Sequence, residues 1–158
     1  MDLELDCAAC GKPIGARHHV LDRRVEAVHF GGEVPTIHTL DLRAVAFFCD
    51  ASCWLEHEPV VRAELRARHT FPTFAAVMPC ARCGDGVDRT SAAVAYTIAD
   101  EVFDAEAKPW LTVDQQSACR TYAVLCQRCE SPEFEDEAGA DEDSAAGVVQ
   151  PVVAQVSA

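Results

Sequence analysis

Eight of the nine cysteines in this chain fall into four close pairs. The pairs are Cys7/Cys10, Cys49/Cys53, Cys80/Cys83 and Cys126/Cys129. Thiolate sulfur is a preferred ligand of Zn²⁺, and a C-x2-C turn presents two sulfurs to one ion. Packing of buried thiols alone would not select so many close pairs. The spacing therefore predicts two Zn²⁺ ions, each bound by four cysteines.

The cysteine pairs also form an internal repeat. Both opening pairs read C-A-x-C-G, with Gly11 and Gly84 following, and they stand 73 residues apart. A glycine suits the left-handed residue of such a tight turn. The repeat favours sequential sites, with the first two pairs sharing one ion and the last two sharing the other. A cross-brace, joining the first pair to the third and the second to the fourth, stays open.

Four thiolates can also hold a rubredoxin-like iron. The closing pairs read "CDASC" and "CQRC" and lack the Cys-Pro-x-Cys-Gly knuckle of such proteins. Zinc is therefore preferred to iron as the cofactor.

The elements that position the first two pairs are a hairpin and a helix. Residues 18–30 and 36–48 favour strands, and the "GGEVP" stretch between them predicts a turn. Asp50 is a good N-cap for a helix beginning at Ala51, which we expect to run to Pro59, where a second helix begins. Cys53 then lies in the first helical turn, where free amides favour a thiolate.

The second half of the chain predicts a ribbon with no closing helix. Residues 91–98, 101–103 and 121–126 favour strands, and residues 104–109 favour a turn. A helix after Cys129 is disfavoured, because Pro132 and dense acidic charge follow.

The first unit resembles treble-clef zinc fingers of the FCS/TRASH-like kind. The resemblance is carried by "CAACGKPI" (residues 7–14) and "FFCDASCWLEH" (residues 47–57). It implies Cys7, Cys10, Cys49 and Cys53 as ligands. Asp50 replaces the serine of that family, and the hairpin is longer than usual. The second unit resembles zinc ribbons in general.

These patterns predict a small α+β protein with two tandem zinc-stapled units. We expect the first unit over residues 1–70, the second over 71–130, and a disordered acidic tail over 131–158. The tail carries seven carboxylates and no basic residue, so its charges repel one another. An alternative for the tail is that residues 148–156, "VVQPVVAQV", form an edge strand.

Charge and composition bear on partners and location. The formal net charge is −13, which disfavours nonspecific nucleic-acid binding. Three arginines, Arg62, Arg66 and Arg68, are concentrated in the second predicted helix; we expect Arg62 and Arg66 on one face, either simply solvated or contacting a partner. Acidic residues near the N-terminus and the paired cysteines favour a reducing, cytoplasmic location, and no segment predicts a membrane span.

The sequence predicts no catalytic site. Four sulfurs complete a zinc tetrahedron and leave no position for water, so we expect a non-enzymatic module that binds an unidentified protein partner. The alternatives are a sequence-specific nucleic-acid-binding regulator that uses the three arginines and a thiol redox sensor. His57 is expected to be an ordinary helix residue, His18 and His19 to point to opposite faces of a strand, and Cys119 to be either a buried small residue or a reactive thiol.

Overall fold

The computed structural model describes residues 5–102, 119–130 and 149–151. In these ranges the elements are β1 (Arg17–His29), β2 (Thr36–Phe48), α1 (Ala51–Leu65), β3 (Val77–Pro79), β4 (Gly86–Asp88), β5 (Ala93–Val102), β6 (Arg120–Leu125) and β7 (Val149–Pro151). All strand pairs are antiparallel. The prediction of a small α+β fold and that of the β1–β2 hairpin are confirmed.

Strands from both predicted units form one sheet. Its order is β6-β5-β1-β2-β7, and β1 pairs with β5 along ten residues. At the centre of that pairing Arg23 lies opposite Tyr96, 73 residues later, which is the offset between Cys7 and Cys80. The pairing of β1 with β5 is therefore approximately two-fold symmetric about this point. The boundary predicted near residue 70 does not separate two sheets.

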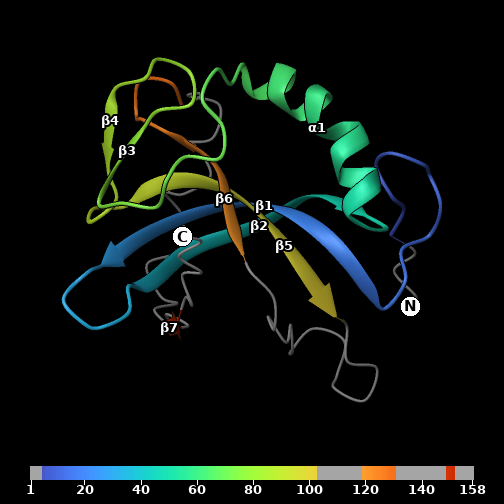
Figure 1. The fold of residues 1–158 in the computed structure, drawn as a ribbon, viewed down its shortest axis with the longest axis horizontal. Helices are drawn as coiled ribbons and strands as arrows, with labels where there is room; N and C mark the ends of the chain where they lie inside the picture. Colours follow the sequence, from blue (N-terminus) through green and yellow to red (C-terminus); the bar gives the residue numbers. More distant parts are fainter. Residues whose placement is uncertain (1–4, 103–118, 131–148, 152–158) are drawn as a thin grey trace, which may run out of the picture.

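The core lies between this sheet and α1, which crosses one face of it (Figure 1). Phe48, Trp54, Tyr122 and Phe71 form a chain of edge-on ring contacts, with centroids 5.3, 5.2 and 5.1 Å apart. Such contacts add about 0.5–1.5 kcal/mol per pair to the burial of the rings. The chain links the start of α1 to β6, so residues of both halves share one core.

The helix does not restart at Pro59, and that expectation was wrong. One helix runs from Ala51 to Leu65 with Pro59 inside it. A proline removes one backbone hydrogen bond and crowds the preceding turn. Trp54 and Val61, one on each side of the proline, are buried against the rest of the molecule. This burial keeps the parts of α1 before and after Pro59 in one continuous helix.

The predicted break in the second half also disappears, because β5 is one strand over Ala93–Val102. The sequence predicts separate strands over residues 91–98 and 101–103. Asp100 pairs with His19 of β1, and the guanidinium of Arg17, the first residue of β1, donates to its carboxylate at 2.6 Å. The turn predicted over 104–109 lies outside the described residues.

Most of the predicted tail lies outside the described residues, as does any helix after Cys129. Val149–Pro151 are described, and they form β7, which pairs with β2 over Thr36–His38. These three residues therefore form an edge strand, as the alternative prediction for the tail has it, and are not disordered.

Candidate metal centres

The first group of cysteines gathers where three elements meet. Cys7 and Cys10 belong to the N-terminal knuckle, Cys49 follows β2, and Cys53 lies in the first turn of α1. Their four sulfur atoms all lie within 4.8 Å of one another. The Sγ atoms of Cys10 and Cys49 are 3.6 Å apart.

Local hydrogen bonds shape this first site. The amide of Gly11 donates to the carbonyl of Cys7 at 2.8 Å, and Gly11 has φ of +70°, where a side chain would be strained. The amide of Ala8 donates to the carbonyl of Phe47 at 2.9 Å and fixes the knuckle to the end of β2. Asp50 caps α1 by accepting from the amide of Cys53 at 2.9 Å. These bonds bring the two pairs together.

The second group repeats this arrangement at the other end of α1 (Figure 1). Its members are Cys80, Cys83, Cys126 and Cys129, whose sulfur atoms also lie within 4.8 Å of one another. Gly84 has φ of +79°, and its amide donates to the carbonyl of Cys80 at 2.9 Å. The amide of Ala81 donates to Val124 at 2.8 Å, as that of Ala8 does to Phe47. The strands β3 and β4, which flank this knuckle, were not predicted.

The sulfur spacing suits a tetrahedral thiophilic ion. Four sulfurs placed about 2.3 Å from one Zn²⁺ stand about 3.8 Å apart. The separations of 3.6 Å in the first site and 3.7 Å between Cys83 and Cys126 in the second are close to that value. All of these cysteines are free thiols. The grouping is the sequential one, not the cross-brace.

In each site, backbone amides donate hydrogen bonds to one of the four sulfurs. Burial acts to raise the pKa of Cys7, but the amides of Cys10, Cys49 and Ala9 outweigh it and lower the pKa to about 6. Cys80 behaves alike: its pKa falls to about 6 because the amides of Cys83, Cys126 and Arg82 outweigh burial. The amide of Cys126 lies 3.4 Å from the Cys80 sulfur. The equivalent position in each knuckle is therefore prepared for a thiolate.

In each site one further sulfur, that of Cys53 or of Cys129, ionises less easily beside that first thiolate. Partial burial and hydrogen bonds to Cys7 and Cys10 raise the pKa of Cys53 to about 12. Burial and its hydrogen bonds to Cys126 and Cys83 raise the pKa of Cys129 to about 12. A divalent ion would displace these protons, so metal binding at either site releases protons and weakens as the pH falls.

Arg82, between the two cysteines of the second knuckle, ties that site to the helix. Its Nε donates to the carbonyl of Leu65, the last residue of α1, at 2.5 Å, and its guanidinium also donates to the carbonyl of Cys129. The amides of Arg68 and His69 both donate to the carbonyl of Ala81 in the same knuckle. The sequence did not predict this role of Arg82, because its partners, the carbonyls of Leu65 and Cys129, are distant in the sequence and no local pattern indicates them.

Of the three arginines singled out in the sequence, only Arg62 lies within α1, so the helix expected to carry Arg62 and Arg66 on one face ends before Arg66. Arg62 lies in α1 and forms an ion pair with Glu58 at 2.8 Å. Arg66 is the left-handed C-cap, with φ of 53°, and Arg68 lies beyond the helix. The helix ends early because the chain turns here to bond with the second knuckle.

The remaining candidates lie outside both cysteine groups. The ring of His57 packs on Phe48 with centroids 5.6 Å apart. His18 approaches Glu101 at 3.5 Å, whereas His19 approaches Asp100 at 3.8 Å. Burial raises the pKa of Cys119, although the charge of Arg24 acts to lower it. Its thiol therefore stays protonated near neutral pH, which argues against the prediction of a reactive thiol.

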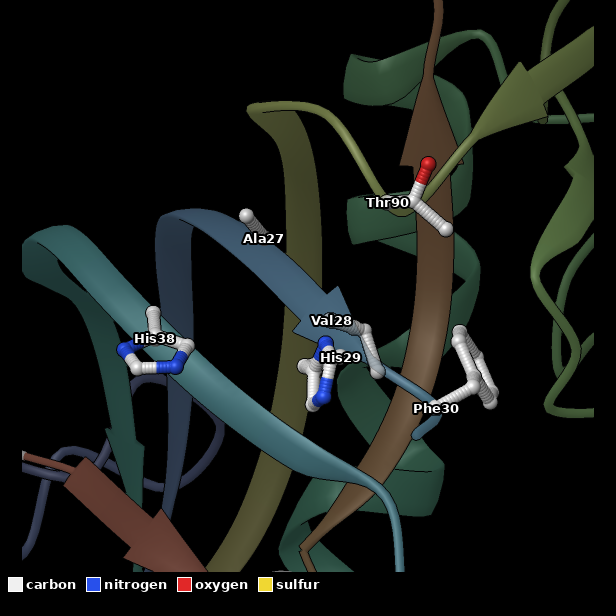
Figure 2. Close-up of a pocket in the computed structure, with 6 residues that line it drawn as sticks. All are labelled: Ala27, Val28, His29, Phe30, His38 and Thr90. Atoms are coloured by element: carbon white, nitrogen blue, oxygen red, sulfur yellow. The ribbon is translucent and has the colours of Figure 1, made fainter. Parts of the chain in front are cut away.

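A shallow hollow lies near the tip of the β1–β2 hairpin. It has a volume of about 260 Å³ and is lined by Ala27, Val28, His29, Phe30, His38 and Thr90. Figure 2 shows the rings of His29 and His38 on neighbouring strands. Within the described ranges, three or more metal-ligating side chains gather only in the two cysteine groups. The hollow is therefore not a third such centre.

Comparison with protein families, curated proteins and solved structures found no match for this chain. The interpretation of both sites accordingly depends on the residues and geometry described above. Among the described residues, no helix is both long and apolar enough to span a membrane.

Proposed function

We propose that this protein is a non-catalytic interaction module whose fold is held by two structural Zn²⁺ ions. The observation that carries the proposal is the pair of four-sulfur groups, each within 4.8 Å and each with a spacing typical of a tetrahedral tetrathiolate. Each group joins segments that are far apart in the sequence. A metal bound there would close the N-terminal knuckle onto β2 and the second knuckle onto β6.

The donor set supports zinc. Four sulfurs are poor ligands for Mg²⁺ and Ca²⁺, which prefer oxygen, and they suit Zn²⁺ or iron. A tetrahedron of four protein ligands leaves no open position for water or substrate, so a structural role is favoured over a catalytic one. Within the first unit, the order knuckle, hairpin, helix supports a treble-clef-like zinc finger, and the second unit is more like a zinc ribbon.

A hollow beside the first site supports an interaction role. Its volume is about 240 Å³, and its apolar walls include Trp54, Leu55, Phe71 and Ile98, with Asp100 and Arg120 among its charged residues. Leu55 is 66% exposed. Apolar hollows with a few charged groups are typical of surfaces that accept a side chain of a partner protein. We propose a protein partner in a reducing, cytoplasmic setting.

Metal content and folding test the structural part of this proposal. Protein purified under reducing conditions should contain two zinc ions per chain. Cys7→Ser with Cys10→Ser should remove one ion, and Cys80→Ser with Cys83→Ser the other, whereas Cys119→Ser, outside both groups, should remove none. A wild-type protein that folds cooperatively with no bound metal would contradict the proposal.

The interaction part needs a separate test. Proteins that co-purify with the metal-loaded chain should be identified with wild type and with Leu55→Arg, and each should then be produced and its affinity measured directly. A genuine partner binds wild type and binds Leu55→Arg more weakly, while both chains keep two zinc ions. Equal binding of every candidate to the two chains would contradict the use of this hollow.

A further inference from the structure

The two edges of the sheet differ in how they are covered. On β6, the amide of Phe71 donates to Tyr122 and that of Ala81 donates to Val124, so the chain between α1 and the second knuckle lies along that edge. On β2, β7 pairs only with residues 36–38, and Ala8 bonds only to Phe47. Between them, residues 39–46 have no strand on their outer side in the part of the chain that the structure describes.

This open stretch carries apolar side chains in solvent. Leu40, Leu42 and Val45 are 65%, 54% and 51% exposed. The pairing of β2 with β1 shifts register at two places, each leaving one of these residues, Leu40 or Val45, as an extra residue. Between the two shifts, residues 41–44 pair with β1 in unbroken register. An unpaired strand edge with exposed apolar residues is a template for another strand.

The charges on this stretch indicate what that strand is. Asp41 and Arg43 lie on either side of Leu42, with side chains 44% and 49% exposed, and within one chain they approach each other at 3.5 Å. Asp41 also lies 3.7 Å from Arg23. In an antiparallel pairing of β2 with a second β2 centred on Leu42, Asp41 of each copy faces Arg43 of the other. Centring on Arg43 would oppose two arginines, and centring on Asp41 would oppose two carboxylates, both unfavourable. Only the Leu42 register makes two opposite-charge pairs.

We propose that β2 is a self-association edge, through which two copies of this chain join their sheets in antiparallel register about Leu42. The Leu42 side chains meet at the two-fold axis, and Leu40 of each copy lies opposite Ala44 of the other. Main-chain hydrogen bonds supply the attraction, and the Asp41–Arg43 pairs fix the register. The proposal goes beyond the zinc-stabilised module, because neither the cysteine sites nor a second kind of protein takes part in the contact.

Sedimentation of the full, metal-loaded chain over a dilution series tests the proposal. Wild type should show a monomer–dimer equilibrium. Leu42→Asp places two carboxylates at the axis and should weaken dimerisation at least about tenfold. Val60→Glu, which adds the same charge at an exposed site of α1, should leave it unchanged. Zinc content and circular dichroism should be the same in all three proteins.

Charge exchange tests the register. Arg43→Asp puts a carboxylate opposite Asp41 of the other copy and should weaken the dimer. Within one chain it also removes the Arg43–Asp41 ion pair of 3.5 Å, so unchanged zinc content and circular dichroism must show that the variant folds. Adding Asp41→Arg to Arg43→Asp restores opposite charges and should recover the dimer. A monomeric wild type, equal effects of Leu42→Asp and Val60→Glu, or no recovery in the double variant would each overturn the proposal.

Discussion

The two cysteine sites share one kind of knuckle and differ in how it is closed. In the first, three residues separate Cys49 from Cys53, and Cys53 lies in the capped first turn of α1. In the second, two residues separate Cys126 from Cys129, and the pair belongs to a turn in which the amides of Cys129 and Glu130 both donate to the carbonyl of Cys126 at 3.0 Å. The sulfur spacing is nearly the same in both.

This comparison shows which part of each site sets its geometry. The amides that lower the pKa of Cys7 and Cys80 come from equivalent positions in both sites, two in the knuckle and one at the closing pair. The closing pair can therefore begin a helix or a turn without changing the sulfur arrangement. What differs is the attachment: the second knuckle also holds the end of α1 through Arg82, whereas Ala9 occupies the equivalent place in the first.

Loss of the second knuckle should have the largest effect. Structural zinc contributes folding free energy on the order of 10 kcal/mol, and this knuckle also bonds to α1, to β6 and to the residues after the helix. We expect Cys80→Ser with Cys83→Ser to abolish slow amide exchange in both β5 and β1. Cys7→Ser with Cys10→Ser should leave slow exchange in β5 and β6. Equal loss from the two variants would contradict the difference in attachment.

Arg82→Ala should come next. It leaves the carbonyls of Leu65 and Cys129 without their donor and should lower the free energy of unfolding by about 2 kcal/mol in urea titrations of the metal-loaded chain. Arg128 offers a matched control in the same site, because its side chain is 75% exposed and pairs only at the surface with Asp85. Arg128→Ala should cost little. Similar losses for both arginines would remove the special role of Arg82.

Substituting the knuckle glycines, Gly11 and Gly84, should have a smaller effect on stability, and the two variants form a matched pair. A side chain at their positive φ costs about 1–2 kcal/mol. A Cβ at Gly11 would meet nothing within 4 Å, whereas one at Gly84 would lie 3.4 Å from Nε2 of His69. We expect both Gly→Ala variants to be destabilised in thermal unfolding, Gly84→Ala slightly more. A neutral or stabilising Gly84→Ala would show that this turn is wrongly described.

The helix cap should have the smallest effect and belongs to the first site alone. Asp50→Ala removes the acceptor of the Cys53 amide and should cost about 1 kcal/mol. Asp50→Ser keeps an acceptor and should retain most of that stability. The measurement is the unfolding midpoint with zinc bound. An Asp50→Ser variant as unstable as Asp50→Ala would argue against a capping role.

Features encoded in short stretches were predictable from the sequence. Glycine after each knuckle, the turn between β1 and β2, and Asp50 before Ala51 each have a local cause, and the sequence repeat favoured the sequential grouping of the cysteines. Long-range pairing was not predictable in this way. Nothing near Arg23 indicates that it faces Tyr96 in β5, and so the five-stranded sheet that both halves share was missed. The helix passed Pro59 because burial on both sides outweighed a local penalty.

Cobalt substitution tests the two tetrathiolate sites most directly. Co²⁺ should be titrated into the metal-free, reduced chain while the absorption spectrum is recorded. We predict strong d–d bands of tetrahedral cobalt together with sulfur-to-cobalt charge-transfer bands, both rising until two equivalents are bound and then constant, with Cys119→Ser behaving as wild type. Weak octahedral bands, or saturation at one equivalent or fewer, would contradict the existence of two four-sulfur metal centres.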